Sequence, residues 1–312
     1  MIELVMLIGL FSATMWNSAP LVLASLGETI VERGGILNLG IEGAMLMGAF
    51  SGFMGAYLTG NLWIGLLTSM VAGVITVLIF GFFVIRMNLD QVVSGLAINL
   101  MATGLCVYFF TLFFAGGQLP YLVSLISPYP IPGLSQIPVI GDILFNQSIF
   151  VYIGFIATPL IFYLVFKTSF GLRLRSIGED PAIALYLGIN VSRTRVLSLI
   201  IEGVLVGMAG GLLTISMFNT FDTRIVAARG FIAVSIVILG RWNPIGAFGG
   251  SLLFGFTAAL SLWLSAFITG PDAVSISQLL SVLPYVVTLL ALVIGGRKVR
   301  APAALGSPFA KE

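Results

Sequence analysis

The stretch Leu4–Leu26, LVMLIGLFSATMWNSAPLVLASL, contains no charged residue and is long enough to cross a bilayer as a helix. Glu3 precedes it where a secretory signal peptide would carry Lys or Arg, so we expect a retained helix. Comparable apolar stretches recur along the chain. They predict an all-α membrane protein, because lipid requires every backbone polar group to be hydrogen-bonded within the protein.

The composition agrees with this prediction. Of the 312 residues, 59% are hydrophobic and 8% are charged, whereas a soluble domain carries about 25% charged residues. The mean hydropathy is +1.13. The apolar runs are continuous rather than alternating, which disfavours a β-barrel. Cys106 is the only cysteine and there is no histidine, so we expect no disulfide framework, no metal cofactor and no imidazole-based enzyme chemistry.

The apolar stretches suggest about ten transmembrane segments. Eight are long, at residues 2–25, 41–58, 61–85, 92–115, 149–167, 196–217, 245–268 and 276–295. Two are shorter than the roughly 20 residues that a span needs, at residues 27–40 and 229–240. Short, glycine-interrupted segments of this kind are typical of broken helices beside a transport path.

The basic residues predict an orientation by the positive-inside rule. With the N-terminus in the cytoplasm, ten alternating spans place eleven of the fourteen basic residues inside, namely Arg86, Lys167, Arg173, Arg175, Arg193, Arg195, Arg241, Arg297, Lys298, Arg300 and Lys311. The outer side keeps Arg33, Arg224 and Arg229. We therefore expect both termini in the cytoplasm, in a multi-pass membrane protein.

The chain reads as one transmembrane domain, residues 1–312, with two halves at 1–166 and 196–296. A cytoplasmic segment at 167–195 separates the halves, and a cytoplasmic tail follows at 297–312. NLWIGLLTSMVAG from Asn61 resembles NPIGAFGGSLLFG from Asn243. The likeness indicates either a five-plus-five inverted repeat or a chance match between glycine-rich helices.

Residues 116–148 form the one large outer segment, and they contain five of the thirteen prolines. We expect an ordered loop rather than another span. Such a loop either docks an external partner or simply covers the outer face.

The segment Ser176–Arg195, SIGEDPAIALYLGINVSRTR, gathers helix signals and charge in a mostly apolar chain. Asp180 suits the N-cap, Pro181 suits the first helical position, and Gly188 suits a left-handed stop. These signals predict a short helix of about Asp180 to Leu187. Two turns are too short to be stable alone, so we expect this helix to dock a soluble subunit.

Three stretches together resemble permease subunits of bacterial ABC importers for simple sugars and nucleosides. They are ERGGILNLGIEGAMLMGAFSG (Glu32–Gly52), the segment TSFGLRLRSIGEDPAIALYLGINVSRTRVLSLIIEGVLVGMAGGL from Thr168, and ARGFIAVSIVILGRWNPIGAFGGSLLFG (Ala228–Gly255). The likeness covers roughly residues 16 to 296. The NLGIEG and GRWNP forms are most similar to the nucleoside-type (guanosine-type) permeases.

The resemblance implies a permease pair, two ATPase domains that bind the ATP, and an extracellular lipoprotein-type binding protein. No G-x-x-x-x-G-K-[ST] phosphate loop occurs, which agrees with ATP hydrolysis by a partner chain. The second permease is expected to be a different, homologous chain. The residues expected to couple to the ATPase are Gly178, Glu179, Asp180, Pro181, Ala182, Ile183, Leu185, Tyr186 and Gly188.

Polar and aromatic residues near breaks and outer ends are candidates for the substrate pathway, because a nucleoside offers a flat base and polar edges. The candidates are Asn38, Glu42, Asn99, Phe218 and Asn219. Glu42 is read either as a brace for the broken helix or as a site near the gate. Asn99 is read either as a substrate contact or as an interhelical hydrogen bond, and Phe218 either as a ligand contact or as core.

Three further carboxylates need partners, because charge is costly inside a bilayer. Glu28 and Glu32 are expected either near the outer face beside Arg33 or in a substrate vestibule. Glu202, where the family more often has a small residue, is expected to pair with an arginine or to act at a gate. The four tryptophans are expected to be interfacial anchors.

These features predict the permease subunit of an ATP-driven nucleoside importer. One alternative is an ABC permease of the same type whose cargo is a pentose or branched-chain amino acids. The other is an ion-coupled secondary transporter, which the capped cytoplasmic helix disfavours.

Overall fold

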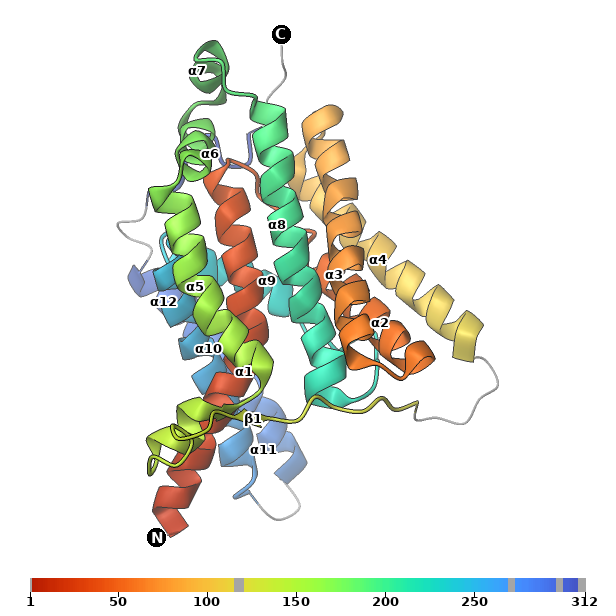
Figure 1. Ribbon diagram of the computed structural model, residues 1–312, viewed down its shortest axis with the longest axis vertical. Helices are drawn as coiled ribbons and strands as arrows, with labels where there is room; N and C mark the ends of the chain where they lie inside the picture. Colours follow the sequence, from red (N-terminus) through yellow and green to blue (C-terminus); the bar gives the residue numbers. More distant parts are fainter. Residues whose placement is uncertain (1, 115–120, 269–272, 296–299, 308–312) are drawn as a thin grey trace.

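The computed structural model describes residues 2–114, 121–268, 273–295 and 300–307. Helices dominate this part of the chain, and most of them run along the long axis of the molecule (Figure 1). The helices are α1 (Ile2–Arg33), α2 (Ile41–Thr59), α3 (Leu62–Gly81), η1 (Phe82–Arg86), α4 (Gln91–Phe114), η2 (Gly141–Phe145), α5 (Ile149–Lys167), α6 (Ser169–Glu179), α7 (Pro181–Tyr186), α8 (Val191–Leu212), η3 (Leu213–Phe218), α9 (Arg229–Leu239), α10 (Pro244–Ser265), α11 (Ala273–Leu280) and α12 (Leu283–Gly295).

Among the described residues, seven helices are long and apolar enough to cross a membrane, and two shorter apolar stretches, Arg229–Leu239 and Val274–Leu290, accompany them. One of the ten expected segments is therefore corrected. Residues 27–40 are not a separate short helix, because residues 27–33 continue α1 and 34–40 form the turn to α2. Helix α1 continues through Glu28 and Glu32 without a break. Both carboxyl side chains are buried within the protein rather than exposed to lipid, so the helix need not end before them.

The direction of α1 corrects the expected position of the termini. Ala304 N donates to Gly178 O at 2.9 Å, and Gly178 packs against the Arg33 backbone, so residues 300–307 lie at the Arg33 end of α1. A helix of 32 residues spans about 48 Å. Ile2 and residues 300–307 therefore lie at opposite ends of the molecule (Figure 1), whereas both termini were expected on one side.

Helices α3 and α10 begin with the same kind of N-cap. Asn61 Oδ1 accepts from Trp63 N at 2.9 Å, and Asn243 Oδ1 accepts from Ile245 N at 2.9 Å. Each asparagine thus satisfies one of the free N–H groups at the start of its helix. The two helices run in opposite directions (Figure 1), as expected from the two similar stretches that begin at these asparagines.

Helix α8 is the central helix of the bundle and packs against α1, α2 and α3. In its most apolar stretch 72% of the residues are buried within the protein, compared with 17% in α4, which lies at the periphery (Figure 1). Glycines make this packing close: a Cβ on Gly203 would lie 2.6 Å from the Val74 Cα of α3, and a Cβ on Gly48 would lie 2.6 Å from the Gly207 carbonyl oxygen. The backbones approach each other because these positions carry no side chain.

The described part of the outer segment, residues 121–148, is an ordered loop, as expected. Its strands β1 (Tyr129–Pro130) and β2 (Asn146–Gln147) pair antiparallel at the end opposite α7 (Figure 1). Val123 N donates to Asn219 O at 2.9 Å and Ile126 N donates to Ile215 O at 3.0 Å, which ties the loop to η3. Residues 116–120 of the expected loop lie outside the described residues.

Candidate functional site

Helix α7 projects from one end of the molecule beyond α6 (Figure 1). Asp180 Oδ1 accepts from the backbone nitrogens of Ala182 and Ile183, both at 2.9 Å, and Pro181 is the first helical residue. Gly188 has φ +81°, the left-handed region that glycine adopts without a Cβ penalty. The expected short helix and its caps are therefore present.

The side chains of α7 separate into an inner and an outer face. Ala184 is buried against Ile177 and Val191, and Leu185 packs against the same cluster. On the outer face Ile183 is 57% exposed and Tyr186 is 90% exposed. An exposed aromatic and aliphatic pair on a rigid turn is a typical contact surface for a protein partner.

The other residues of the expected coupling set differ in position. Glu179, Asp180 and Ala182 are exposed beside the outer face, and Pro181 is half-buried. Gly178 is buried, and a Cβ there would overlap the Arg33 carbonyl oxygen. We therefore interpret Gly178 and Leu185 as residues that seat α6 and α7 on the bundle rather than as contacts for a partner.

The turn between α1 and α2 is centred on Asn38, which is buried. Asn38 N donates to Glu28 Oε1 at 3.0 Å, and Asn38 Nδ2 donates to Glu202 Oε1 at 2.9 Å. Asn38 Oδ1 accepts from Gly40 N at 2.9 Å. These bonds join α1, the turn and α8, so in this conformation Asn38 acts as a brace.

Three carboxyl groups meet around this turn. Glu28, Glu32 and Glu202 each have no exposed surface, and Glu28 lies beside both of the other carboxyls. Trp242 Nε1 donates to Glu32 Oε2. Burial of three carboxyls is costly, and the donors from Asn38 and Trp242 offset part of that cost. Their side chains are neither at the outer face nor in an open vestibule.

The arginines near this cluster bind backbone carbonyl groups. Arg33 Nε donates to Trp242 O at 2.7 Å, and Arg195 Nε donates to Gly34 O at 3.0 Å. Arg33 thus ties the end of α1 to the α9–α10 turn rather than serving as the expected partner of Glu28 and Glu32. Trp242 is 4% exposed, so the expectation of an interfacial anchor is wrong for this tryptophan.

Helix α4 holds the same turn from another side of the bundle. Asn99 Oδ1 accepts from Gly43 N at 2.7 Å, and Asn99 Nδ2 donates to Leu39 O at 2.8 Å. Gln91 Oε1 accepts from Leu37 N at 2.7 Å. Asn99 therefore makes an interhelical brace, the second of its two expected roles. Gln91 was missed by sequence reasoning because a glutamine at the start of a helix carries no distinctive signal.

Glu42 lies in the first turn of α2, as expected, and its carboxylate reaches α9. Glu42 Oε1 accepts from Ala228 N at 2.9 Å, and Glu42 Oε2 accepts from Gly230 N at 2.7 Å. It therefore caps the N-terminus of α9, where the helix dipole favours an anion. Of the two expected roles, the geometry shows the brace.

Phe218 and Asn219 lie far from these residues, at the end of η3 that holds the outer loop. Phe218 is 45% exposed, and Asn219 has φ +51°. The structure thus gathers Asn38, Glu42 and Asn99 around one turn and places the other two candidates near the opposite end of the bundle. In this conformation only the second group offers an exposed aromatic face. No group of side chains suited to a metal ion occurs in the described residues.

Replacing Glu202 by leucine is expected to lower the free energy of unfolding by about 1–3 kcal/mol, because Asn38 Nδ2 would lose its acceptor in a buried site. Glu202→Gln keeps that acceptor and is expected to retain most of the stability. Thermal unfolding of the purified chain in detergent measures the difference. Glu179→Leu, at an exposed carboxylate, is the control, and equal stability of the Gln and Leu variants would contradict the bracing role.

The chain matches proteins of known type over most of its length. The family described as "Branched-chain amino acid transport system / permease component" matches residues 10–292. The guanosine ABC transporter permease protein NupQ of Bacillus subtilis (strain 168) is 37% identical over 306 residues, which cover 96% of this chain and 95% of that protein. The guanosine ABC transporter permease protein NupP of the same organism is 24% identical and covers 78% and 70%.

Among solved structures, an inward-facing conformation of a metal-chelate type ABC transporter covers 93% of this chain and 82% of that chain, with a TM-score of 0.50 and 16% identity. At this identity the likeness concerns the fold alone, and it agrees with the membrane helices described above. This chain therefore belongs to the family of ABC transport system permease components.

Proposed function

We propose that this chain is the permease subunit of an ATP-driven importer that carries nucleosides across the cytoplasmic membrane of a bacterium. The proposal is supported first by the full-length similarity to a guanosine permease. As a permease component, the chain is a transport protein and not itself an enzyme. Its partners are those of an ABC permease, an ATPase and a substrate-binding protein.

The distribution of basic residues supports a cytoplasmic position for the α7 end. Nine described Lys and Arg residues lie in α6 or at helix ends and turns on this side, namely Arg33, Arg86, Lys167, Arg173, Arg175, Arg193, Arg195, Arg241 and Arg300. Of the described basic residues only Arg224 and Arg229 fall outside this group. Because α1 is continuous, Arg33 joins the inner group, and the charge asymmetry is larger than the sequence suggested.

The two ends of the molecule then suit two soluble partners. At the cytoplasmic end, the outer face of α7 is proposed to enter a cleft of the ATPase, with Tyr186 as its most exposed contact. At the outer end, the loop 121–148 is proposed to face a lipoprotein-type binding protein. A second, homologous permease is proposed to complete the membrane part, and two guanosine permeases of one bacterium resemble this chain.

Phe218 and Asn219 are the proposed contacts of the substrate pathway. Phe218 exposes its ring at the outer end of the central helix, where a nucleoside base can stack on it. Asn38, Glu42 and Asn99 are proposed to set the position of the α1–α2 turn and of the start of α9 along the path. Their hydrogen bonds would have to rearrange before any of them contacts a substrate.

Two alternatives make different predictions. A permease for a pentose or for branched-chain amino acids would keep the same partners and change only the cargo. An ion-coupled secondary transporter would need no ATPase. The exposed, capped α7 favours the ABC assignment, because a short helix with a 90% exposed tyrosine needs a partner.

Uptake by the reconstituted complex of both permeases, ATPase and binding protein tests the proposal. Labelled guanosine, a labelled pentose and labelled leucine are offered with and without ATP. We expect ATP-dependent uptake of the nucleoside. ATP-dependent uptake of the pentose or leucine alone would correct the cargo, and equal uptake without ATP under an ion gradient would overturn the mechanism.

A further inference from the structure

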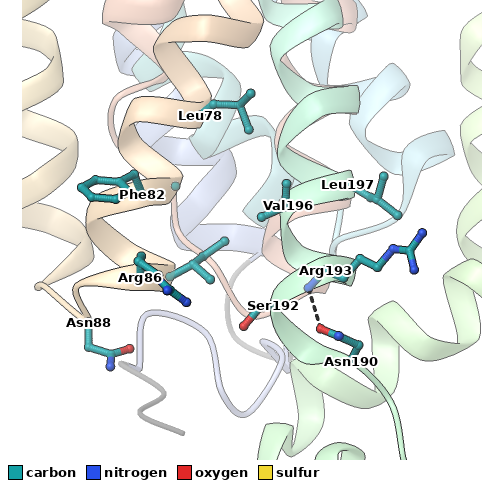
Figure 2. Close-up of a pocket in the computed structure, with 11 residues that line it drawn as sticks. Leu78, Phe82, Arg86, Asn88, Asn190, Ser192, Arg193, Val196 and Leu197 are labelled. Atoms are coloured by element: carbon teal, nitrogen blue, oxygen red, sulfur yellow. Dashed lines mark hydrogen bonds between the residues drawn. The ribbon is translucent and has the colours of Figure 1, made fainter.

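A cavity of about 780 Å³ lies between the end of α3–η1 and the first two turns of α8 (Figure 2). It is separate from the buried carboxyl cluster and from the outer face of α7. The residues that line it are Leu78, Gly81, Phe82, Ile85, Arg86, Asn88, Asn190, Ser192, Arg193, Val196 and Leu197.

The lining changes character with depth. Its rim is polar, with two arginines, two asparagines and a serine at the α7 end of the helices, and it contains no acidic residue. Its walls are apolar and include Leu78, Phe82 and Val196. From Leu78 to Arg86 the helix rises about 12 Å, so the walls reach well below the basic rim. The cavity is thus amphipathic, with a basic mouth and an apolar interior.

The walls also open sideways. Phe82 is 55% exposed and Leu197 is 43% exposed, although both lie on helices that are long and apolar enough to cross a membrane. Apolar side chains that are exposed along a membrane helix can contact lipid. An occupant can therefore enter from the bilayer as well as from the polar end.

The positions of the two arginines differ (Figure 2). Arg86 reaches from η1 toward α8, and the Ser192 hydroxyl points toward α3. Arg193 extends from α8 away from α3, and Asn190 Oδ1 accepts from its backbone nitrogen at 2.9 Å. Arg86 is therefore the main cation at this mouth. Arg193 is exposed, so its side chain can contribute after rotation.

We propose that this cavity binds an anionic phospholipid, with the phosphate at Arg86, Ser192 and Arg193 and an acyl chain against Phe82 and Val196. Basic pockets between transmembrane helices on the cytoplasmic side are suited to anionic head groups. A soluble anion would use the mouth and leave the apolar walls hydrated. A soluble protein would have to insert about 12 Å along the helices to fill them. An anionic phospholipid matches both the basic mouth and the apolar walls of the cavity.

The site adjoins the segment proposed to dock the ATPase. Asn190 is the N-cap of α8 and Ser192 lies in its first turn, two and four residues after Gly188. A bound lipid would hold this start against η1, so it would restrain the junction between α7 and α8. The lipid site itself needs only a membrane-spanning chain and does not depend on the cargo.

Native mass spectrometry of the purified full-length permease tests the proposal, with phosphatidylglycerol and phosphatidylcholine added at equal amounts. Wild type is expected to retain one phosphatidylglycerol preferentially. Arg86→Gln should reduce that preference about fivefold, which corresponds to about 1 kcal/mol for one arginine near an anionic group. Arg193→Gln should have a smaller effect, and Arg173→Gln, an exposed arginine on α6 outside the cavity, should have none.

Two further arms distinguish the source of the phosphate and the role of the walls. Soluble glycerol 1-phosphate should not displace the lipid, because it lacks the acyl chain. Val196→Trp should remove the preferentially retained lipid by filling the apolar wall, while thermal unfolding checks that this variant is folded. Equal phosphatidylglycerol retention by wild type and Arg86→Gln would overturn the proposal. Displacement by glycerol 1-phosphate, or unchanged retention by a folded Val196→Trp, would overturn it as well.

Discussion

Replacing Tyr186 by alanine is expected to weaken binding of the ATPase by about 30-fold and to abolish most transport, while the permease stays folded in the membrane. Tyr186 is 90% exposed on a capped helix, so its truncation removes little from the permease itself. Exposed aromatic anchors of an interface typically contribute about 2 kcal/mol or more. Titration of the purified permease with tagged ATPase measures the affinity, and immunoblots of membranes measure the abundance.

Tyr129→Ala is the matched control, because Tyr129 is a 63% exposed tyrosine in β1 at the other end of the molecule. This variant should bind the ATPase as wild type does. Asp180→Ala tests the helix rather than the contact, since it removes both hydrogen bonds at the N-cap and should destabilise α7 by about 0.5–2 kcal/mol. If Tyr186→Ala and Asp180→Ala both kept ATPase binding and transport, α7 would not be the docking element.

Replacing Gly210 by alanine is expected to remove most of the folded protein from the membrane. A Cβ at this position would overlap the Met45 carbonyl oxygen and lie 2.8 Å from the Ala49 backbone nitrogen. Those atoms belong to the backbone of α2, so helices α2 and α8 would have to separate. Overpacking of this kind costs about 1–3 kcal/mol or more, and here it falls on the central helix. Membrane abundance and thermal unfolding in detergent measure the loss.

Gly249→Ala in α10 is the matched control for this substitution. It makes the same chemical change inside a membrane helix, but no atom lies within 4 Å of the added Cβ. Alanine favours the helix over glycine by about 1 kcal/mol, so this variant should be as stable as wild type or slightly more stable. Equal loss of both variants would indicate that glycine content itself, rather than the α2–α8 contact, decides insertion.

Local signals predicted the parts of the molecule that depend on neighbours in sequence. Asp180, Pro181 and Gly188 predicted a capped two-turn helix, and α7 has the expected caps. The proline-rich segment predicted an ordered loop, and residues 121–148 form one. The short apolar helix at 229–240 was also predicted, and it is α9. In each case a few adjacent residues contain the whole signal.

Predictions that depended on distant partners were less accurate. Glu28 and Glu32 suggested the start of a separate segment near the surface, but Asn38 and Trp242 bind them inside the bundle. Because of this one difference, the sequence separated Arg33 from the α6–α7 segment, whereas in the structure Arg33 packs against Gly178 of α6. The brace formed by Asn99 and the cap formed by Glu42 were among the roles considered, and the sequence could not choose between those roles.

The sequence by itself determined the class of protein, since the backbone polar groups of long continuous apolar runs can be hydrogen-bonded in lipid only if the runs form membrane helices. It also determined the capped helix α7, because capping acts within one turn of the chain. Only the tertiary structure decided which end of α1 meets α7, which polar side chains brace the α1–α2 turn, and where an amphipathic cavity opens. These features join residues up to 210 positions apart, and pairings at such separations follow from packing rather than from local preference.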